Sequence, residues 1–274
     1  MFLCGQTTIL YVRSNDLKAI LERIEKHRFL FEELVKRDFK KKYKRTVLGM
    51  LWSVLSPLLQ LLVMSVVFTK FFGRSTPHYT IYLFSGNLLF TFFKESTNGG
   101  MHSLMQNAAI IKKINLPKYI FLLSREVSSC INFGLNMIVY FLFVAIDGVP
   151  FTWKFILLLY PIIFLLIFNI GFGFILSALF VLFKDIQYLY DVFTLMLMYL
   201  SAIFYTTDAF SPMMQKMFYL NPLYTYISYV REVVLYQNIP ALWHHGLCVL
   251  YAAAALLIGC IMYKKMNYKF LYYM

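Results

Sequence analysis

Six long apolar stretches constrain the fold of this chain more than any other feature. A helix needs roughly 20 apolar residues to cross the hydrocarbon core of a bilayer. The stretches therefore predict an all-α membrane protein with six transmembrane helices, and an even number of crossings places both termini on the same face. They cover residues 48–72, 79–98, 119–147, 154–183, 188–207 and 242–263.

The distribution of basic residues indicates which face is cytoplasmic. Twelve of the 26 Lys and Arg residues precede the first stretch, and most of the others fall in the loops and tail expected on the same side. Loops rich in Lys and Arg stay in the cytoplasm. We therefore expect both termini in the cytoplasm. The opposite side has only Lys70, Arg74, Lys154, Lys216 and Arg231.

The net charge of +13 is explained by the same topology. In a soluble protein it would suggest a nucleic-acid partner, but here the charge flanks apolar stretches and suits anionic membrane lipids, so we expect no nucleic acid. The Cys and His residues show no metal-ligand spacing, and no phosphate loop, zinc motif or dinucleotide fingerprint occurs. We therefore expect no metal and no cofactor bound by this chain.

The N-terminal region, residues 1–47, is charged and has apolar residues at near-helical spacing. This pattern favours a cytoplasmic amphipathic helix lying in the headgroup layer of the membrane. A cytoplasmic helix packed on a partner is the alternative. Residues 48–263 form the transmembrane domain, and residues 264–274 form a basic cytoplasmic tail. The apolar residues of the amphipathic helix are Phe31, Leu34, Val35, Phe39 and Tyr43.

Two segments between the stretches also have a distinctive pattern. The cytoplasmic segment at about 101–117 has a short helical run that ends at Pro117, so we expect a compact helix there, with a plain loop as the alternative. The external segment at about 208–240 is apolar but is interrupted by proline, and neither half is long enough to span. It predicts an external re-entrant helical pair between helices 5 and 6. A surface-lying amphipathic segment is the alternative.

Polar residues inside the stretches form two patterns. In the fourth stretch Asn169, Gly173 and Ser177 form a small-residue seam, which favours close contact with another helix. The third stretch has a polar stripe on one helical face, and such groups face the bundle interior or a water-filled cavity. The stripe indicates either hydrogen bonding between helices or channel lining. It consists of Arg125, Ser128, Ser129, Asn132 and Asn136.

Three motifs together resemble a known family. The first has basic residues and a Tyr before TVLGMLW and a Pro within residues 35–73, the second is LFKDIQYLYDVF at 182–193, and the third is LNPLYTYISYVREVVLYQNIP at 220–240. In this order they resemble the permeases of type-2 ABC exporters for O-antigen, teichoic acid and capsular polysaccharides. Lys184 stands where that family usually has Arg, and Val230 stands where it often has an aromatic residue.

The resemblance implies the transmembrane permease subunit of an ATP-driven ABC transporter that exports a lipid-linked cell-surface polysaccharide. It implies a multi-pass protein of the bacterial cytoplasmic membrane, a homodimer, and two copies of a separate ABC ATPase subunit that holds ATP and Mg. The chain itself would then not be an enzyme. A permease of the same superfamily for drug or lipid efflux is the alternative. A scaffold or a secondary transporter fits less well, because inverted repeats would give broken helices in both halves and only one broken region occurs.

Roles for individual residues follow from the resemblance together with residue type. Attraction of an anionic lipid headgroup is expected from Lys40, Lys41, Lys42, Lys44 and Arg45. Coupling to the ATPase is expected from Met105, Ile110, Ile111, Lys112, Lys113, Lys184 and Asp185. The substrate pathway is expected to combine polar groups with rings on which sugars stack, and to include Trp52, Gln60, Phe68, Asn132, Asn136, Tyr190, Phe193, Tyr199 and Phe204.

Overall fold

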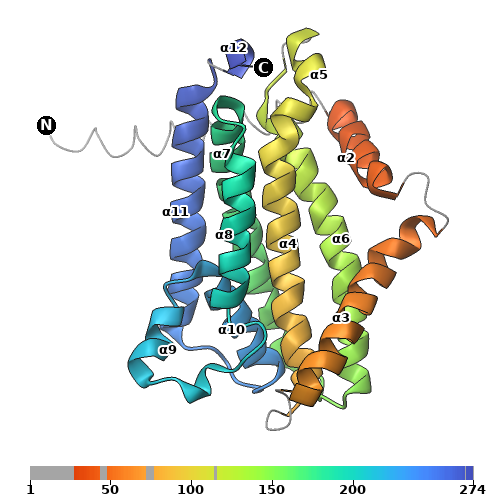
Figure 1. Cartoon of the computed structure of the whole chain (residues 1–274), viewed down its shortest axis with the longest axis vertical. Helices are drawn as coiled ribbons and strands as arrows, with labels where there is room; N and C mark the ends of the chain where they lie inside the picture. The colour runs from red at the N-terminus through yellow and green to blue at the C-terminus, as the bar shows by residue number, and fades with distance from the viewer. Residues whose placement is uncertain (1–27, 44–47, 72–76, 114–115, 269, 274) are drawn as a thin grey trace, which may run out of the picture.

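A computed structural model describes residues 28–43, 48–71, 77–113, 116–268 and 270–273. Every regular element in those ranges is a helix, and the long helices run side by side (Figure 1). In chain order the elements are α2 (Arg28–Tyr43), η1 (Gly49–Leu51), α3 (Trp52–Phe71), α4 (Tyr79–Gln106), α5 (Ala108–Lys113), α6 (Tyr119–Ile146), η3 (Trp153–Leu158), α7 (Leu159–Leu182), α8 (Ile186–Leu200), η4 (Thr207–Ala209), α9 (Pro212–Phe218), α10 (Pro222–Val234), α11 (Leu242–Met266) and α12 (Phe270–Tyr273).

Three of the described helical segments are long and apolar enough to cross a membrane. They are α6, the continuous run of η3 and α7, and α11. Helix α8 is apolar but has only 15 residues. Helices α3 and α4 have 20 and 28 residues and are not among these three segments. A helix satisfies its own backbone hydrogen bonds, which is what a segment surrounded by lipid requires. The predicted class, an all-α membrane protein, is confirmed at this level.

The segment at 101–117 is divided between two helices. Helix α4 continues through Gln106, so it is longer than the apolar stretch that predicted it, and the short helix α5 covers only Ala108–Lys113. Asn107 separates the two helices, and its side-chain amide donates a hydrogen bond to the carbonyl of Ser103 at 2.7 Å. Asn side chains that bond to nearby backbone compete with the helical pattern in this way.

Helix α8 ends at residue 200, although the apolar stretch continues to residue 207. The buried guanidinium of Arg231 donates hydrogen bonds to the carbonyls of Ala202 and Ile203 at 2.9 and 3.3 Å, and the hydroxyl of Tyr82 donates to the carbonyl of Ala202 at 3.2 Å. The Arg231 group also lies 3.4 Å from the centroid of the Tyr82 ring. These side chains replace the backbone donors of a continuing helix, so the chain turns at Ala202, whose φ is 47°.

Two short helices, α9 and α10, occupy the region predicted to be a broken pair. Each begins with a capping residue followed by proline, an arrangement that favours helix initiation. The Ser211 side chain accepts a hydrogen bond from the amide of Met214 at 3.5 Å, and the Asn221 side chain accepts one from the amide of Leu223 at 3.0 Å. Both helices lie at the end of the bundle opposite α5 and α12 (Figure 1).

Glycines bring three of the long helices close together. A Cβ atom added at Gly171 of α7 would lie 2.4 Å from the backbone carbon of Ala255 in α11, and one added at Gly259 would lie 2.3 Å from the oxygen of Gly171. On α7, Gly173 faces α4, where a Cβ on Gly100 would lie 3.1 Å from its Cα. The close contact predicted for Gly173 is therefore present, whereas the tighter contact of Gly171 with α11 was not predicted.

The contact between α7 and α11 gives a direct test. Gly171→Ala and Gly259→Ala should each lower the free energy of unfolding by about 1–3 kcal/mol or more, because the added methyl meets backbone that cannot move aside without separating the helices. The measurement is the midpoint of thermal unfolding in detergent. Gly134→Ala is the matched control, since nothing lies within 4 Å of its Cβ position. Equal midpoints for all three variants would contradict the contact.

Candidate functional site

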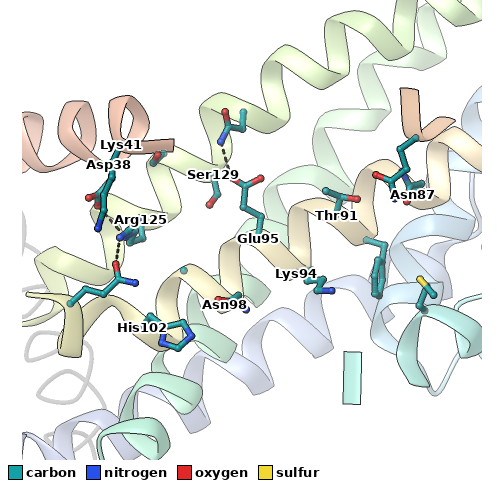
Figure 2. A pocket seen from close by; sticks show the side chains of 17 residues that line it. Asp38, Lys41, Asn87, Thr91, Lys94, Glu95, Asn98, His102, Arg125 and Ser129 are labelled. Atoms are coloured by element: carbon teal, nitrogen blue, oxygen red, sulfur yellow. Dashed lines mark hydrogen bonds and ion pairs between the residues drawn. The ribbon is translucent and has the colours of Figure 1, made fainter. Parts of the chain in front are cut away.

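A polar cavity of about 750 Å³ lies among helices α2, α3, α4 and α6, with Met198 contributed by α8. Figure 2 shows the side chains that line it. Helices α2 and α3 provide few of these residues and α4 provides the most. Polar groups at such a position are costly in a membrane protein unless they surround water or a ligand, so the cavity is the strongest candidate site in the described part of the chain.

One face of α4 forms the longest wall of the cavity. Its polar residues recur every three or four positions, which places them on one side of the helix. Asn87 lies toward one end of the cavity and His102 toward the other, with Thr91 and Lys94 between them (Figure 2). This stripe was not among the predicted site residues, although the same spacing identified the stripe on α6. Its members are Asn87, Thr91, Lys94, Asn98, His102 and Gln106.

The α6 stripe faces the α4 stripe across the cavity. Ser128 and Ser129 line the cavity, and the amide of Asn132 donates a hydrogen bond to the carboxylate of Glu95 on α4 at 2.7 Å. Asn136 is buried and lies outside the cavity lining. The sequence left two roles open for the α6 stripe, hydrogen bonding between helices and channel lining. The structure shows a hydrogen bond from Asn132 to α4, and Ser128 and Ser129 line the cavity.

Charged side chains close the end of the cavity nearest α2. Arg125 Nε lies 3.2 Å from Asp38 Oδ2, and the side chain of Arg125 also donates to Gln106. Arg37 donates to Asp38 Oδ1 at 2.7 Å and to Asn107 Oδ1 at 2.9 Å. We call these five residues the charged junction. It connects α2 to α6 and to the boundary between α4 and α5, and the side chain of Asp38 within it is fully buried.

The predicted pathway residues occupy several different environments. Gln60 and Asn132 line the cavity. Tyr190 is buried, and its hydroxyl lies 2.6 Å from the hydroxyl of Thr97 on α4. Tyr199 has an exposed fraction of 56%. Of the others, Trp52 is exposed on α3, Phe193 stacks on Phe172, Phe204 is buried, and the side chain of Phe68 lies outside the described residues.

The predicted headgroup residues are only partly described. Lys41 lines the cavity, and Lys40 is exposed on α2. The side chain of Lys42, together with Lys44 and Arg45, lies outside the described residues. Of the two described lysines, only Lys41 lies at the cavity that the charged junction closes.

The predicted coupling residues divide by exposure. Ile111 is buried and belongs to an apolar cluster that includes Leu34 of α2 and Leu104 of α4. Ile111 thus holds α5 against the bundle. Met105 and Ile110 are half-buried beside the same cluster, whereas Lys112, Lys113, Lys184 and Asp185 are exposed.

Comparison with known proteins agrees with this architecture. The family model described as ABC-2 type transporter matches residues 30–235. The chain is 29% identical over 251 residues to an O-antigen export system permease protein RfbA from Klebsiella pneumoniae, covering 88% of this chain and 95% of that protein. It is 23% identical over 223 residues to a protein of the same name from Myxococcus xanthus, covering 81% and 86%.

The chain belongs to the ABC-2 type transporter family, whose members are the membrane components of ABC transporters. Membership and the apolar helices together establish a multi-pass membrane protein. The family resemblance identified from the three sequence motifs is thereby confirmed.

The charged junction predicts a specific response to substitution. Asp38→Asn should destabilise the fold by about 1–3 kcal/mol, because the fully buried carboxylate loses its ion pairs with Arg37 and with Arg125, whose side chain is 19% exposed. Arg125→Gln should destabilise the fold less, because the carboxylate of Asp38 keeps its hydrogen bond from Arg37. The double variant should lose less than the sum of the two losses. The measurements are thermal unfolding in detergent and hydrogen exchange of the amides in α2.

The exposed ion pair of the same helix supplies the control. Lys36 and Glu33 are 2.9 Å apart, with side chains 58% and 49% exposed, and the carboxylate of Glu33 raises the pKa of Lys36. Because water screens exposed pairs, Glu33→Gln should leave both measurements unchanged. A loss of stability in Glu33→Gln as large as that in Asp38→Asn would contradict the prediction, because helix α2 would then respond to any change of charge.

Proposed function

We propose that this chain is the transmembrane permease subunit of an ABC transporter that exports a lipid-linked cell-surface polysaccharide across the cytoplasmic membrane. The similarity to permeases named for O-antigen export, over 88% of the chain, carries the proposal. The lining of the cavity supports it further, because amides and hydroxyls match the hydroxyl groups of a glycan. An apolar drug or simple lipid, the alternative substrate class, would find few matching groups there.

The proposed topology has six transmembrane helices: α3, α4, α6, α7, α8 and α11. The end of the bundle that carries α2, α5 and α12 is assigned to the cytoplasm, because most Lys and Arg residues flank that end. Helices α9 and α10 then lie on the external side as the re-entrant pair between α8 and α11. Their capping residues and their lengths of 7 and 13 residues suit short helices that do not cross.

The proposed assembly contains two copies of this chain and two copies of a separate ATPase that binds ATP and Mg. Helix α5 and the loop before α8 are the proposed contacts with the ATPase. The side chains of Lys113, Lys184 and Asp185 are exposed and available to such a partner. Lys112 is also exposed, and Ile111 fixes α5 to α2 and α4. The charged junction includes Asn107, which directly precedes α5. Movement of α5 would therefore reach α2 through the hydrogen bond between Asn107 and Arg37.

Depletion of this protein tests the proposed function. Cells without it should accumulate a lipid-linked glycan on the inner face of the cytoplasmic membrane and lose the corresponding surface polysaccharide. The measurements are mass spectrometry of extracted lipid-linked glycans and labelling of surface glycans, with restoration by the wild-type gene as the control. Normal surface glycan in fully depleted cells would contradict the proposal.

The aromatic residues of α8 allow packing to be separated from transport. Tyr199→Phe should preserve export while Tyr199→Leu lowers it, because a sugar stacks on a flat ring and this ring is exposed. Tyr190→Phe should instead lower the free energy of unfolding by about 1 kcal/mol, since the buried hydroxyl loses its bond to Thr97. Export is measured by surface glycan and stability by thermal unfolding. If Leu at position 199 supports export as well as Phe, the ring has only a packing role.

A further inference from the structure

The C-terminal end of α11 is bonded to the start of α6. Helix α11 ends at Met266, and the last carbonyls of a helix have no partner within it. Lys118, which directly precedes α6, donates hydrogen bonds from its ammonium to the backbone carbonyl and the side-chain oxygen of Asn267, at 2.6 and 3.0 Å. A lysine at this position is also favoured by the helix dipole. Lys118 therefore caps a helix whose end is 149 residues away in the chain.

The tail that follows this cap is anchored by a buried ring. Phe270 of α12 has an exposed fraction of 0%, whereas Tyr268 and Tyr272 are 89% and 85% exposed. The centroid of the Phe270 ring lies 5.1 Å from that of Tyr263 in α11 and 5.4 Å from Lys118 Nζ. Burial of a large apolar side chain is favourable, and a cation over an aromatic face adds to the attraction. We call Lys118, Tyr263, Asn267 and Phe270 the C-terminal clasp.

The apolar cluster that receives Phe270 also holds α5. It contains Phe270 together with Ile111 of α5 and Leu34 of α2, and Leu116, between α5 and α6, packs against it. Helices α5 and α12 lie at the same end of the bundle (Figure 1). Helix α5 has only six residues, which is too short to be stable by itself, so its position depends on what surrounds it. Asn107 ties the start of α5 to α2, and the cluster and Lys118 support the other end.

We propose that the C-terminal clasp positions α5, with Phe270 as the positioning residue. While the Phe270 ring is docked, the tail closes the cluster in which Ile111 is buried and holds Lys118, five residues beyond the end of α5. When the ring is removed, α5 loses one of its two supports. The inference rests on the proposed function, because only a contact between α5 and the ATPase makes the position of α5 matter for export. The tail would then act on that contact from within the same chain.

Hydrogen exchange of the purified full-length protein in nanodiscs tests the clasp. Phe270→Ala should speed the exchange of the α5 amides by about tenfold or more, because loss of a buried ring opens the cluster that holds α5. Exchange in α10, at the opposite end of the bundle, should not change, whereas a general loss of stability would speed both. Phe270→Leu should retain most of the protection, since it keeps an apolar side chain in the cluster. The matched control is Tyr272→Ala, which removes an exposed ring from the same helix and should exchange like the wild type.

Lys118 provides a milder variant for the same measurement. Lys118→Met keeps an apolar stem of similar length but loses both hydrogen bonds to Asn267, so α5 should exchange faster than in the wild type and more slowly than in Phe270→Ala. Lys118→Arg can still donate to the carbonyl and should exchange like the wild type. The matched control is Lys265→Met, which removes an exposed lysine from the last turn of α11.

Surface glycan measures the consequence for transport. In cells with equal amounts of protein in the membrane, Phe270→Ala should lower surface glycan, while Phe270→Leu and Tyr272→Ala should keep it at the wild-type level. Exchange of α5 that is the same in Phe270→Ala and Tyr272→Ala would overturn the clasp, as would an equal increase in α5 and α10. Faster exchange of α5 with normal surface glycan would overturn its link to export. Failure of the proposed function is distinguishable, because it would appear as normal surface glycan in depleted cells, and the exchange measurements do not depend on that result.

Discussion

The ion pair between Asp38 and Arg125 is the interaction on which the candidate site depends. A charge inside an apolar bundle requires a partner, and this pair places the partners on α2 and α6. Helix α2 contributes Asp38 and Lys41 to the cavity wall, so fixing α2 against α6 also fixes this part of the wall. The bonds of Arg37 and Gln106 extend the constraint to the boundary between α4 and α5.

At the opposite end of the bundle a second arginine, Arg231, bonds to backbone carbonyls and, among the described residues, not to a carboxylate. Arg231 bonds to backbone carbonyls of the segment after α8 and to the carbonyl of Tyr82 at 3.0 Å. A Cβ at Gly86 would lie 2.8 Å from this guanidinium, so α4 approaches it closely because it has a glycine there. This arrangement ends α8 and positions the start of the segment that contains α9 and α10.

Between the two ends, α4 performs two tasks with different faces. One face bonds to α6 and α8 and packs on α7 through Gly100, so it fixes the helix in the bundle. The other face presents polar groups to the cavity. The rigidity of the first face keeps the second face in a defined arrangement.

The sequence by itself determined the membrane class, the transporter family, the interruption of the segment at about 208–240, and the polar face of α6. These depend on local properties: apolar length, recurring motifs, prolines and the helical repeat. It did not determine that α8 ends at residue 200, because the responsible donor, Arg231, is 29 residues away from Ala202 in the chain. Nor did it determine that Gly171 meets α11 or that Tyr190 is buried while Tyr199 is exposed. Periodicity shows which residues share a face, but only the tertiary structure decides what that face meets.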